Sequence, residues 1–361
     1  MAIANHGIFP DVIGGMERHT FNLASHLTRE GVDVTVLVPE PKTSTHYNFP
    51  VVHLPWPRRP FWLWSNRKFS EHVGRWIDAH EVDIAFGQGF NLWTYLKKRK
   101  IPAIFHPHGL EMYGSHLRLN EWIATFPFRS LVRYHARWSD VTISLGGGLT
   151  EILRERVNVP NKKLREIPNA VVPGEYTSKD QHPREREFLF VGRLAFNKGI
   201  DLLARALSFV ADLNFKLSIV GTGPFQSMVE RLAQKDPRVT YLPHSEESRL
   251  KQEYQRHQCL LFTSRFEGMP TVVLEAMVSG CAVIATDIGA VNTMVGERNG
   301  FLVNPDPREI GDAIRKFLSM PSPAKQKLGE NGRSIVLEKY AWPKIVKQYL
   351  NLFSELAGVH A

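Results

Sequence analysis

The chain has 361 residues, of which 43% are hydrophobic and 22% charged, and its formal net charge is +9. This length suits two domains, and the hydrophobic content suits packed globular cores. No run of about 18 apolar residues occurs, which excludes a transmembrane helix. The basic balance favours anionic partners such as nucleotides, membrane surfaces or nucleic acid.

Short strand patterns alternate with helical patterns along the whole chain, which is typical of an α/β fold with parallel sheets. In the first half, strands are predicted over residues 2–5, 32–38, 51–54, 82–86, 102–105, 141–144 and 164–167. In the second half, they are predicted over residues 188–191, 216–220, 239–242, 259–262, 281–285 and 300–303. Each half is therefore expected to form its own Rossmann-like β/α array.

The segment 168–183 separates these two arrays. It is rich in Pro, Gly and polar residues and has no periodicity, which indicates a domain boundary. We predict an N-terminal domain over residues 1–170, a C-terminal domain over 171–340, and a final amphipathic helix within 341–361 that crosses back to the first domain. Because ligands of such folds bind outside the carboxyl ends of strands, the loops after strands are the candidate site.

Two loops of the first half carry such features. Gly14 and Gly15 precede an amphipathic helix, where they would let the backbone approach a ligand, although a glycine pair is equally typical of a plain turn. His108 follows the predicted strand 102–105 in the sequence His-Pro-His-Gly. It would face the cleft, or it is a surface histidine of a loop.

The stretch 55–69 interleaves three Trp and two Phe with four basic residues, among them Trp62, Trp64, Arg58 and Arg59. Residues 121–138 repeat this mixture. Large aromatic and basic side chains together are typical of contact with a membrane interface. A loop and a helix packed on the domain's own core, with Arg at the rim, would have the same composition. Nucleic acid is not favoured, because no recognised binding motif accompanies the stretch.

The loop after the first strand of the second half carries two cations, Arg193 and Lys198, and closes at Gly199. Such a pair suits a diphosphate, because Arg offers forked hydrogen bonds and Lys a point charge. Two unrelated exposed basic residues are the alternative. A further turn after a strand contains Gly221 and Gly223, but it does not complete Gly-x-Gly-x-x-Gly, so a dinucleotide site is not supported.

The stretch 264–277, Ser-Arg-Phe-Glu-Gly-Met-Pro-Thr-Val-Val-Leu-Glu-Ala-Met, follows an apolar strand pattern. Pro270 is expected to open a helix, which places Glu267 in the preceding loop and Glu275 on the helix. The free backbone N–H groups of residues 268–272 and the helix dipole suit an anionic ligand. With two carboxylates beside it, the loop predicts a site for a phosphorylated sugar derivative.

No metal site is predicted, because the chain lacks Cys-x-x-Cys, His-Glu-x-x-His and Asp-x-Asp patterns. Cys259 and Cys281 lie in apolar runs and are expected to be buried free thiols, which fits a reducing cytosol. The N-terminal residues have the pattern of a first strand and lack the basic and apolar regions of a signal peptide. A cytoplasmic protein is therefore predicted, with peripheral attachment to the inner face of the membrane if the aromatic and basic stretch binds lipid.

In this order, the motifs resemble those of the retaining, nucleotide-sugar-dependent glycosyltransferases of the large bacterial GT-B group (family 4, glycosyl transferases group 1). The hallmark is Glu-x7-Glu, here Glu267 to Glu275. Val-Gly-Arg-Leu and Lys-Gly within 191–199, Ile-Val-Gly-Thr-Gly-Pro at 219–224, Gly14-Gly15, His108-Gly109 and the terminal Tyr-x-Trp also match. The group includes lipopolysaccharide, capsule and phosphoinositol mannosyl transferases. Two segments depart from it, namely 169–172, which reads Asn-Ala-Val-Val, and 241–245, which lacks the usual glycine of the base pocket.

The resemblance implies roles for individual residues. The implied catalytic residues are Glu267, Arg193, Lys198 and His108. The implied donor-binding residues are Gly14, Gly15, Gly223, Gly268, Met269, Pro270, Thr271 and Glu275. Glu267 would contact hydroxyls of the donor sugar and Glu275 those of the ribose, while the two cations would bind the diphosphate and stabilise the leaving group. Reaction would occur in the cleft between the Glu267 loop, Gly15 and His108.

The implied function is transfer of a hexose-type sugar from a nucleotide diphosphate sugar to a lipid-linked or cell-surface polysaccharide acceptor. The Glu-Gly-Met-Pro loop favours a UDP-sugar, and no cofactor or metal is expected. A nucleotide-sugar epimerase or phosphorylase of the same fold is one alternative. A non-catalytic protein that binds a sugar nucleotide is another, and the presence of Arg193, Lys198 and Glu267 argues against it.

Overall fold

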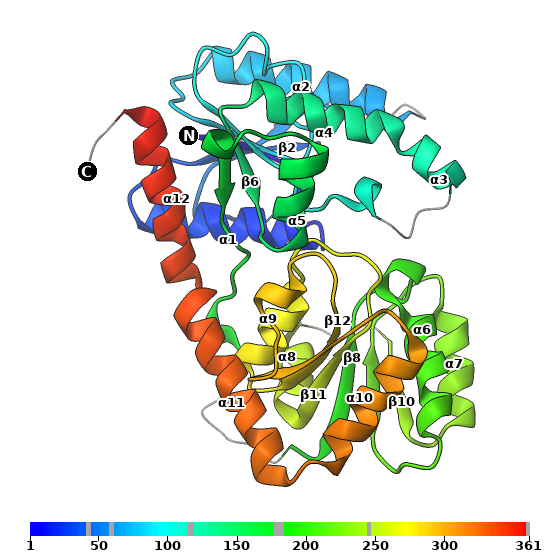
Figure 1. Cartoon of the computed structure of the whole chain (residues 1–361). Helices are drawn as coiled ribbons and strands as arrows, with labels where there is room; N and C mark the ends of the chain where they lie inside the picture. The colour runs from blue at the N-terminus through cyan, green and yellow to red at the C-terminus, as the bar shows by residue number, and fades with distance from the viewer. Residues whose placement is uncertain (41–44, 58–60, 115–118, 177–183, 244–246, 359–361) are drawn as a thin grey trace. The chain divides into compact units, whose positions relative to one another are not determined.

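A computed structural model of the chain describes residues 1–40, 45–57, 61–114, 119–176, 184–243 and 247–358. The structure divides into two compact units (Figure 1). Unit 1 comprises Met1–Asn169 and Trp342–Ala361, and unit 2 comprises Ala170–Ala341. Each unit is built around one parallel β-sheet with helices, so the predicted α/β fold with two Rossmann-like arrays is confirmed.

In its described residues, unit 1 has a seven-stranded sheet in the order β3-β2-β1-β4-β5-β6-β7. The strands are β1 (Ala2–Ala4), β2 (Thr35–Pro39), β3 (Val51–Leu54), β4 (Ala85–Gln88), β5 (Ala103–His106), β6 (Val141–Ser144) and β7 (Leu164–Glu166). The α-helices are α1 (Gly15–Arg29), α2 (Trp62–Asp78), α3 (Leu119–Ala124), α4 (Phe126–Trp138), α5 (Gly148–Glu151) and α12 (Trp342–Ala357). Shorter turns are η1 (Glu111–Tyr113), η2 (Ile152–Arg156) and η3 (Asn161–Lys163).

In its described residues, unit 2 has a six-stranded sheet in the order β10-β9-β8-β11-β12-β13. The strands are β8 (Arg186–Val191), β9 (Leu217–Val220), β10 (Val239–Leu242), β11 (His257–Phe262), β12 (Ala282–Thr286) and β13 (Gly300–Val303). The α-helices are α6 (Ile200–Ala206), α7 (Gln226–Lys235), α8 (Glu247–Arg256), α9 (Thr271–Val278), α10 (Pro307–Ser319) and α11 (Ser322–Lys339). The 3-10 turns are η4 (Pro173–Glu175), η5 (Phe196–Lys198), η6 (Leu207–Val210) and η7 (Val291–Thr293).

Helix α2 shows how the cores form. Its residues Phe69, Val73 and Ile77 recur every four positions, so they lie on one face of the helix. All three are buried against the sheet of unit 1, where they contact a cluster that includes Ala4 and Leu37. In unit 2 the corresponding cluster gathers apolar side chains from β8, β9, β11, α6 and α10.

The strand order reverses at one point in each sheet. β1 pairs with both β2 and β4, and β8 pairs with both β9 and β11. The loops that leave neighbouring strands at such a point diverge, which opens a crevice at the carboxyl ends of the strands. Because β8 and β11 are parallel neighbours, the loops after them both start at the same edge of the sheet and border this crevice, although the sequence separates them widely.

Most strands start or end within two residues of the prediction, and the starts of β2 and β4 differ most from it. β2 begins at Thr35 rather than at residue 32, because the Val32 N–H donates to the Leu27 carbonyl at the end of α1 (3.0 Å) and is not available to the sheet. β4 covers Ala85–Gln88 rather than residues 82–86, since β1 pairs with residues 85–87. The polar, buried Gln88 extends this strand beyond its apolar pattern.

The last helix, α12, belongs to unit 1 and passes close to α1 (Figure 1). Trp342 and Tyr349 are buried, and Tyr349 Oη lies 3.2 Å from Nε2 of His19. Farther along, Glu355 forms an ion pair with Arg165 (2.6 Å). None of the helices in the described ranges is both long enough and apolar enough to cross a membrane.

Candidate active site

An ion pair joins the two loops that follow β8 and β11. Lys198 Nζ donates to Oε1 of Glu267, and Ser264 Oγ approaches the same oxygen at 3.4 Å. The Lys198 and Glu267 side chains are 28% and 17% exposed, so both remain accessible from solvent. A cation and a carboxylate thus lie side by side at the carboxyl edge of the sheet, where a charged, hydroxyl-rich ligand could contact both.

Arg265 connects the loop after β11 to residues that follow β8. Its guanidinium donates to both carboxylate oxygens of Asp201 at 2.6 Å and lies over the ring of Phe196, 3.9 Å from the ring centre. Its backbone N–H donates to the carbonyl of Asn197 (2.8 Å). Burial tends to raise the pKa of Asp201, but the hydrogen bond and charge of Arg265 lower it overall. The sequence did not single out Arg265, because no local pattern identifies a partner 64 residues away.

The two loops also meet through their backbones at Gly199. This residue has φ +66°, and a Cβ placed on it would lie 1.8 Å from the carbonyl oxygen of Thr263. Thr263 in turn donates its hydroxyl to the Gly199 carbonyl (3.0 Å). Glycine is therefore required both by the left-handed conformation and by the close approach.

We expect Gly199→Ala to destabilise unit 2 by at least about 2 kcal/mol, because alanine is strained at this φ and its methyl group would push Thr263 away. Chemical denaturation measures this loss, and transfer activity should fall with it. The matched control is Gly15→Ala, where a Cβ would meet no atom within 4 Å. Equal stability of the two variants would contradict the assigned contact.

Arg193 lies in the loop between β8 and Lys198. Its side chain is exposed and forms no hydrogen bond or ion pair with the residues that the structure describes. The loop itself is held in place, since the Leu194 N–H donates to the carbonyl of Thr222 (2.8 Å), next to Gly223. Arg193 therefore offers an unpaired guanidinium on a supported backbone, close in sequence to Lys198.

The loop from Glu267 into α9 presents backbone donors. Helix α9 begins at Thr271 after Pro270, as predicted, and Met269 and Pro270 are buried. The Gly268 carbonyl accepts from the N–H of Ala290 (3.0 Å), which braces the loop. Within the described chain, the N–H groups of Gly268 and Thr271 have no acceptor. They suit an anion or a sugar hydroxyl at the positive end of the helix.

Glu275 lies on α9 and is buried. The hydroxyl of Tyr254 donates to its Oε2 at 2.9 Å, which fixes the carboxylate. Burial, followed by the negative charge of Glu275, raises the pKa of Tyr254 well above its ordinary value, so the tyrosine remains a donor. A carboxylate anchored in this way is suited to accept hydrogen bonds from ligand hydroxyls.

The other predicted residues lie in unit 1. Gly14 is the N-cap of α1, and Gly15 is the first residue of that helix. His108 has φ +59°, and its Nε2 is hydrogen-bonded to the side chain of Gln88. Its ring stacks on that of His106 at 3.8 Å. Residues 14, 15 and 108 thus lie after β1 and β5, while all the other predicted site residues lie in unit 2.

Three histidines gather in unit 1 at the ends of β4 and β5. The ring of His19 lies 5.2 Å from that of His106 and 5.0 Å from that of His108. Burial lowers the pKa of His19 to about 3 and those of His106 and His108 well below the ordinary value, with smaller contributions from the neighbouring rings. All three are therefore neutral near pH 7, and Gln88 contacts both His19 and His108. The sequence suggested His108 but not His19 or Gln88.

The buried histidines predict a loss of stability in mild acid. Their folded-state pKa values lie below the unfolded value of about 6.5, so the unfolded chain binds more protons once the pH falls below that value. Each such histidine should lower the free energy of unfolding by about 1.4 kcal/mol per pH unit below 6.5, until its folded pKa is reached. Urea denaturation at about pH 7.5 and 5.5 measures the change. A constant midpoint would contradict neutral burial.

The aromatic and basic stretch divides between core and surface. Trp56 and Phe69 pack with the core of unit 1, whereas Phe61, Trp62 and Trp64 are 75%, 40% and 38% exposed. Arg58 and Arg59 lie outside the described residues. In the second stretch, Trp122, Ile123 and Phe126 are also exposed, as is Leu119 just before it. The rings of Trp62 and Phe128, 5.9 Å apart, connect the starts of α2 and α4.

Over the described ranges, no group of three or more His, Cys, Asp or Glu side chains is placed to hold a metal ion. Cys259 and Cys281 are buried and free, and burial raises the pKa of both thiols.

Two units, each built on a parallel sheet, define the fold of the chain. The structure is similar to sucrose-phosphate synthase from Thermosynechococcus elongatus, with a TM-score of 0.83, 20% identity and 99% of each chain covered. It is also similar to the HepE protein of Anabaena in complex with UDP and glucose, with a TM-score of 0.77 and 18% identity, over 98% of this chain and 99% of that one. The fold is GT-B, as predicted.

Two family models match the chain: "Glycosyltransferase Family 4" over residues 13–175 and "Glycosyl transferases group 1" over residues 185–320. A relative described as an uncharacterised glycosyltransferase of Methanocaldococcus jannaschii is 26% identical over an alignment 379 positions long, which covers 95% of both chains. The chain belongs to glycosyltransferase family 4 and is a retaining enzyme that transfers a sugar from a nucleotide sugar. The predicted enzyme class is thereby confirmed, while the roles of individual residues stay predictions.

Proposed function

We propose that this enzyme transfers a hexose from a UDP-sugar to a lipid-linked or cell-surface polysaccharide acceptor, such as a lipopolysaccharide or capsule precursor. The observation that carries the proposal is the Lys198–Glu267 ion pair, which lies in the loops after β8 and β11 together with the unpaired Arg193. One loop supplies cations for a diphosphate, and the other supplies a carboxylate for sugar hydroxyls.

In the proposed reaction, the bond between the anomeric carbon and the diphosphate oxygen breaks while the acceptor hydroxyl oxygen bonds to the same face of that carbon. The acceptor's proton passes to the departing phosphate. Arg193 and Lys198 stabilise the negative charge that develops on the diphosphate, and Glu267 orients the sugar. Glu275, anchored by Tyr254, holds the ribose hydroxyls. Gly15 and His108 contribute from unit 1 to the diphosphate and acceptor side.

The choice of UDP is supported by the Glu-Gly-Met-Pro sequence of residues 267–270 and by the HepE protein, which has been solved with UDP-glucose. The acceptor class is supported by exposed aromatic and aliphatic residues of unit 1, here together called the aromatic patch: Phe61, Trp62, Trp64, Leu119, Trp122, Ile123 and Phe126. We propose that this patch lies against the inner face of the membrane, where a lipid-linked acceptor is available.

Thermal-shift measurements with UDP, GDP, ADP and dTDP test the donor. A nucleotide present at about 100 times its dissociation constant should stabilise the protein by about 2.7 kcal/mol, and UDP should do so at the lowest concentration. A stronger response to another nucleotide would refute the UDP assignment. Incubation with UDP-glucose and no acceptor then tests the reaction class, because release of sugar-1-phosphate or of an epimer would favour a phosphorylase or an epimerase.

A further inference from the structure

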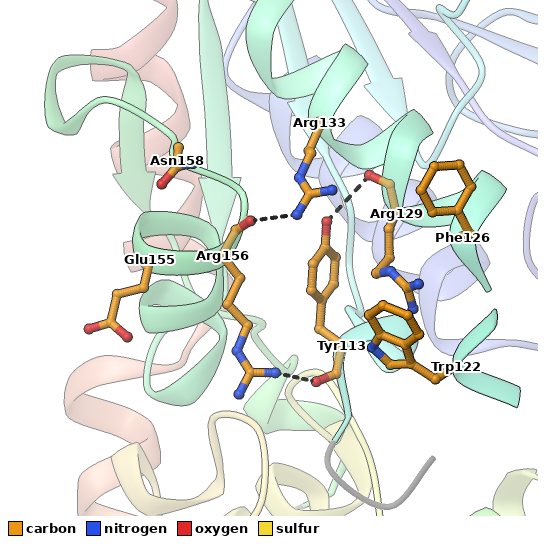
Figure 2. Close-up of a pocket in the computed structure, with 8 residues that line it drawn as sticks. All are labelled: Tyr113, Trp122, Phe126, Arg129, Arg133, Glu155, Arg156 and Asn158. Atoms are coloured by element: carbon orange, nitrogen blue, oxygen red, sulfur yellow. Dashed lines mark hydrogen bonds between the residues drawn. The ribbon is translucent and has the colours of Figure 1, made fainter. Parts of the chain in front are cut away.

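A basic pocket of about 560 Å³ lies within unit 1, and none of its lining residues is among those assigned to the donor (Figure 2). It is formed by η1, α3, α4, η2 and the residue two positions after η2. Its lining residues are Tyr113, Trp122, Phe126, Arg129, Arg133, Glu155, Arg156 and Asn158. Its volume lies in the range of small-molecule sites.

The charge of the pocket is not balanced. Three arginines line it against one carboxylate, Glu155, and none of the three forms an ion pair with any residue that the structure describes. The pocket therefore presents an excess of positive charge.

Arg129 is the buried member of the three, since only 4% of its surface is exposed. Its Nη1 donates to Thr125 Oγ1 (2.8 Å) and to the Met112 carbonyl (3.3 Å), and its guanidinium lies 3.9 Å from the ring centre of Trp122. Its Nη2 is buried and has no acceptor among the described residues. A buried cation with an unused donor and no counter-charge is the arrangement that an anionic ligand would complete.

The other two guanidinium groups are held in place by carbonyls of the pocket wall. Arg156 Nη1 donates to the Tyr113 carbonyl (2.8 Å), and Arg133 Nη2 donates to the Arg156 carbonyl (3.2 Å), as Figure 2 shows. Tyr113 also donates its hydroxyl to the carbonyl of Arg129 (3.3 Å). Each exposed arginine keeps further N–H groups for a ligand, and such prepositioned forks match the geometry of a phosphate.

The rim of the pocket indicates the source of that phosphate. Trp122 and Phe126 both line the pocket and belong to the exposed aromatic patch, and Leu119 and Ile123 are exposed on the same short helix as Trp122. A phosphate group in the pocket would therefore lie beside an apolar surface. A phosphate carried by a lipid satisfies both features, whereas a free phosphate uses only the arginines.

We propose that this pocket binds the phosphoryl or diphosphoryl group of a lipid-linked acceptor, with Arg129, Arg133 and Arg156 as its ligands. The inference rests on the proposed function, since it assigns the site that recognises the acceptor class. It would hold the lipid end of the acceptor in unit 1, separately from the donor residues in unit 2.

Sedimentation of the full chain with vesicles tests the pocket. The probes are phosphatidylcholine vesicles with and without phosphatidic acid, and inorganic pyrophosphate as a competitor. The double variant Arg133→Gln, Arg156→Gln should bind phosphatidic acid vesicles at least about tenfold more weakly, because it loses two charge-assisted contacts. The matched control is Arg137→Gln, an exposed arginine of the same helix that does not line the pocket. Pyrophosphate should release the unmodified protein from the phosphatidic acid vesicles.

Equal binding by the double variant and the Arg137 variant would overturn the proposal. If pyrophosphate binds through Arg133 and Arg156 but vesicles do not, the phosphate site is supported and its assignment to a lipid is overturned. Thermal shifts with UDP on the same variants separate this inference from the proposed function. If the double variant loses vesicle binding but keeps the UDP-induced thermal shift of the unmodified protein, the phosphate site in the pocket is supported. If vesicle binding depends on Arg133 and Arg156 but no nucleotide shifts the melting temperature, only the donor assignment is refuted.

Discussion

Replacement of Lys198 by alanine is expected to lower turnover at least about a hundredfold, because it removes the charge that we propose to stabilise the leaving diphosphate. The ion pair with Glu267 is partly exposed, and such pairs contribute only about 0 to 1 kcal/mol to stability. The catalytic loss should therefore exceed any loss of folding by a wide margin. Steady-state transfer rates and denaturation midpoints, measured on the same preparation, check this difference.

Lys235→Ala is the matched control for this variant. Lys235 lies in the last turn of α7 in the same unit, is exposed, and has no ion-pair partner among the residues that the structure describes. Its removal changes the net charge equally and should leave turnover within about twofold, because a distant exposed charge is screened by solvent. Near-normal transfer by the Lys198 variant would remove Lys198 from the site.

Glu275→Ala is the second variant with a large expected effect, again a loss of at least about a hundredfold in turnover, since it removes the buried and anchored carboxylate that we propose as the acceptor for the ribose hydroxyls. It should also reduce stability by about 1 to 3 kcal/mol, because the hydroxyl of Tyr254 loses its acceptor inside the protein. The activity assay must therefore be run at a temperature where the denaturation curve shows a folded variant.

Glu275→Gln separates these two effects. Its amide oxygen still accepts from Tyr254, so the loss of stability should be smaller than for alanine, while the charge that strengthens the ribose contact is absent. We expect about a tenfold rise in KM for the donor, because one charge-assisted hydrogen bond is lost. Tyr254→Phe should mainly lower stability. An unchanged KM in Glu275→Gln would argue against a ribose contact.

Features that depend on short-range chemistry could be read from the sequence. The alternation of apolar strands and amphipathic helices predicts two parallel sheets, because the period of the hydrophobic pattern is set by local geometry. The position of Glu267 in a loop and of Glu275 on a helix follows from Pro270, which fits the start of a helix. Strand ends were less accurate, since the pairing partner and the cap of the preceding helix decide where β2 and β4 begin.

Composition alone did not decide which aromatic and polar side chains are buried. Trp56 and Trp62 lie in the same stretch, yet one packs with the core and the other is partly exposed, because Trp56 follows β3 closely whereas Trp62 is the first residue of α2. His19 and Gln88 show the converse, polar side chains that are buried because they contact one another. Arg129 belongs to the predicted basic and aromatic stretch, but only the structure places it inside a pocket.

By itself, therefore, the sequence determined the fold class and the family resemblance, and it pointed to the loops that we propose as the site. Only the tertiary structure decided that β8 and β11 are neighbours. That pairing brings Lys198 to Glu267 across 69 residues, and Arg265 to Asp201 across 64. The physical reason is that strand order depends on hydrogen bonds and packing between distant segments, whereas propensity and periodicity report only on residues within a few turns of one another.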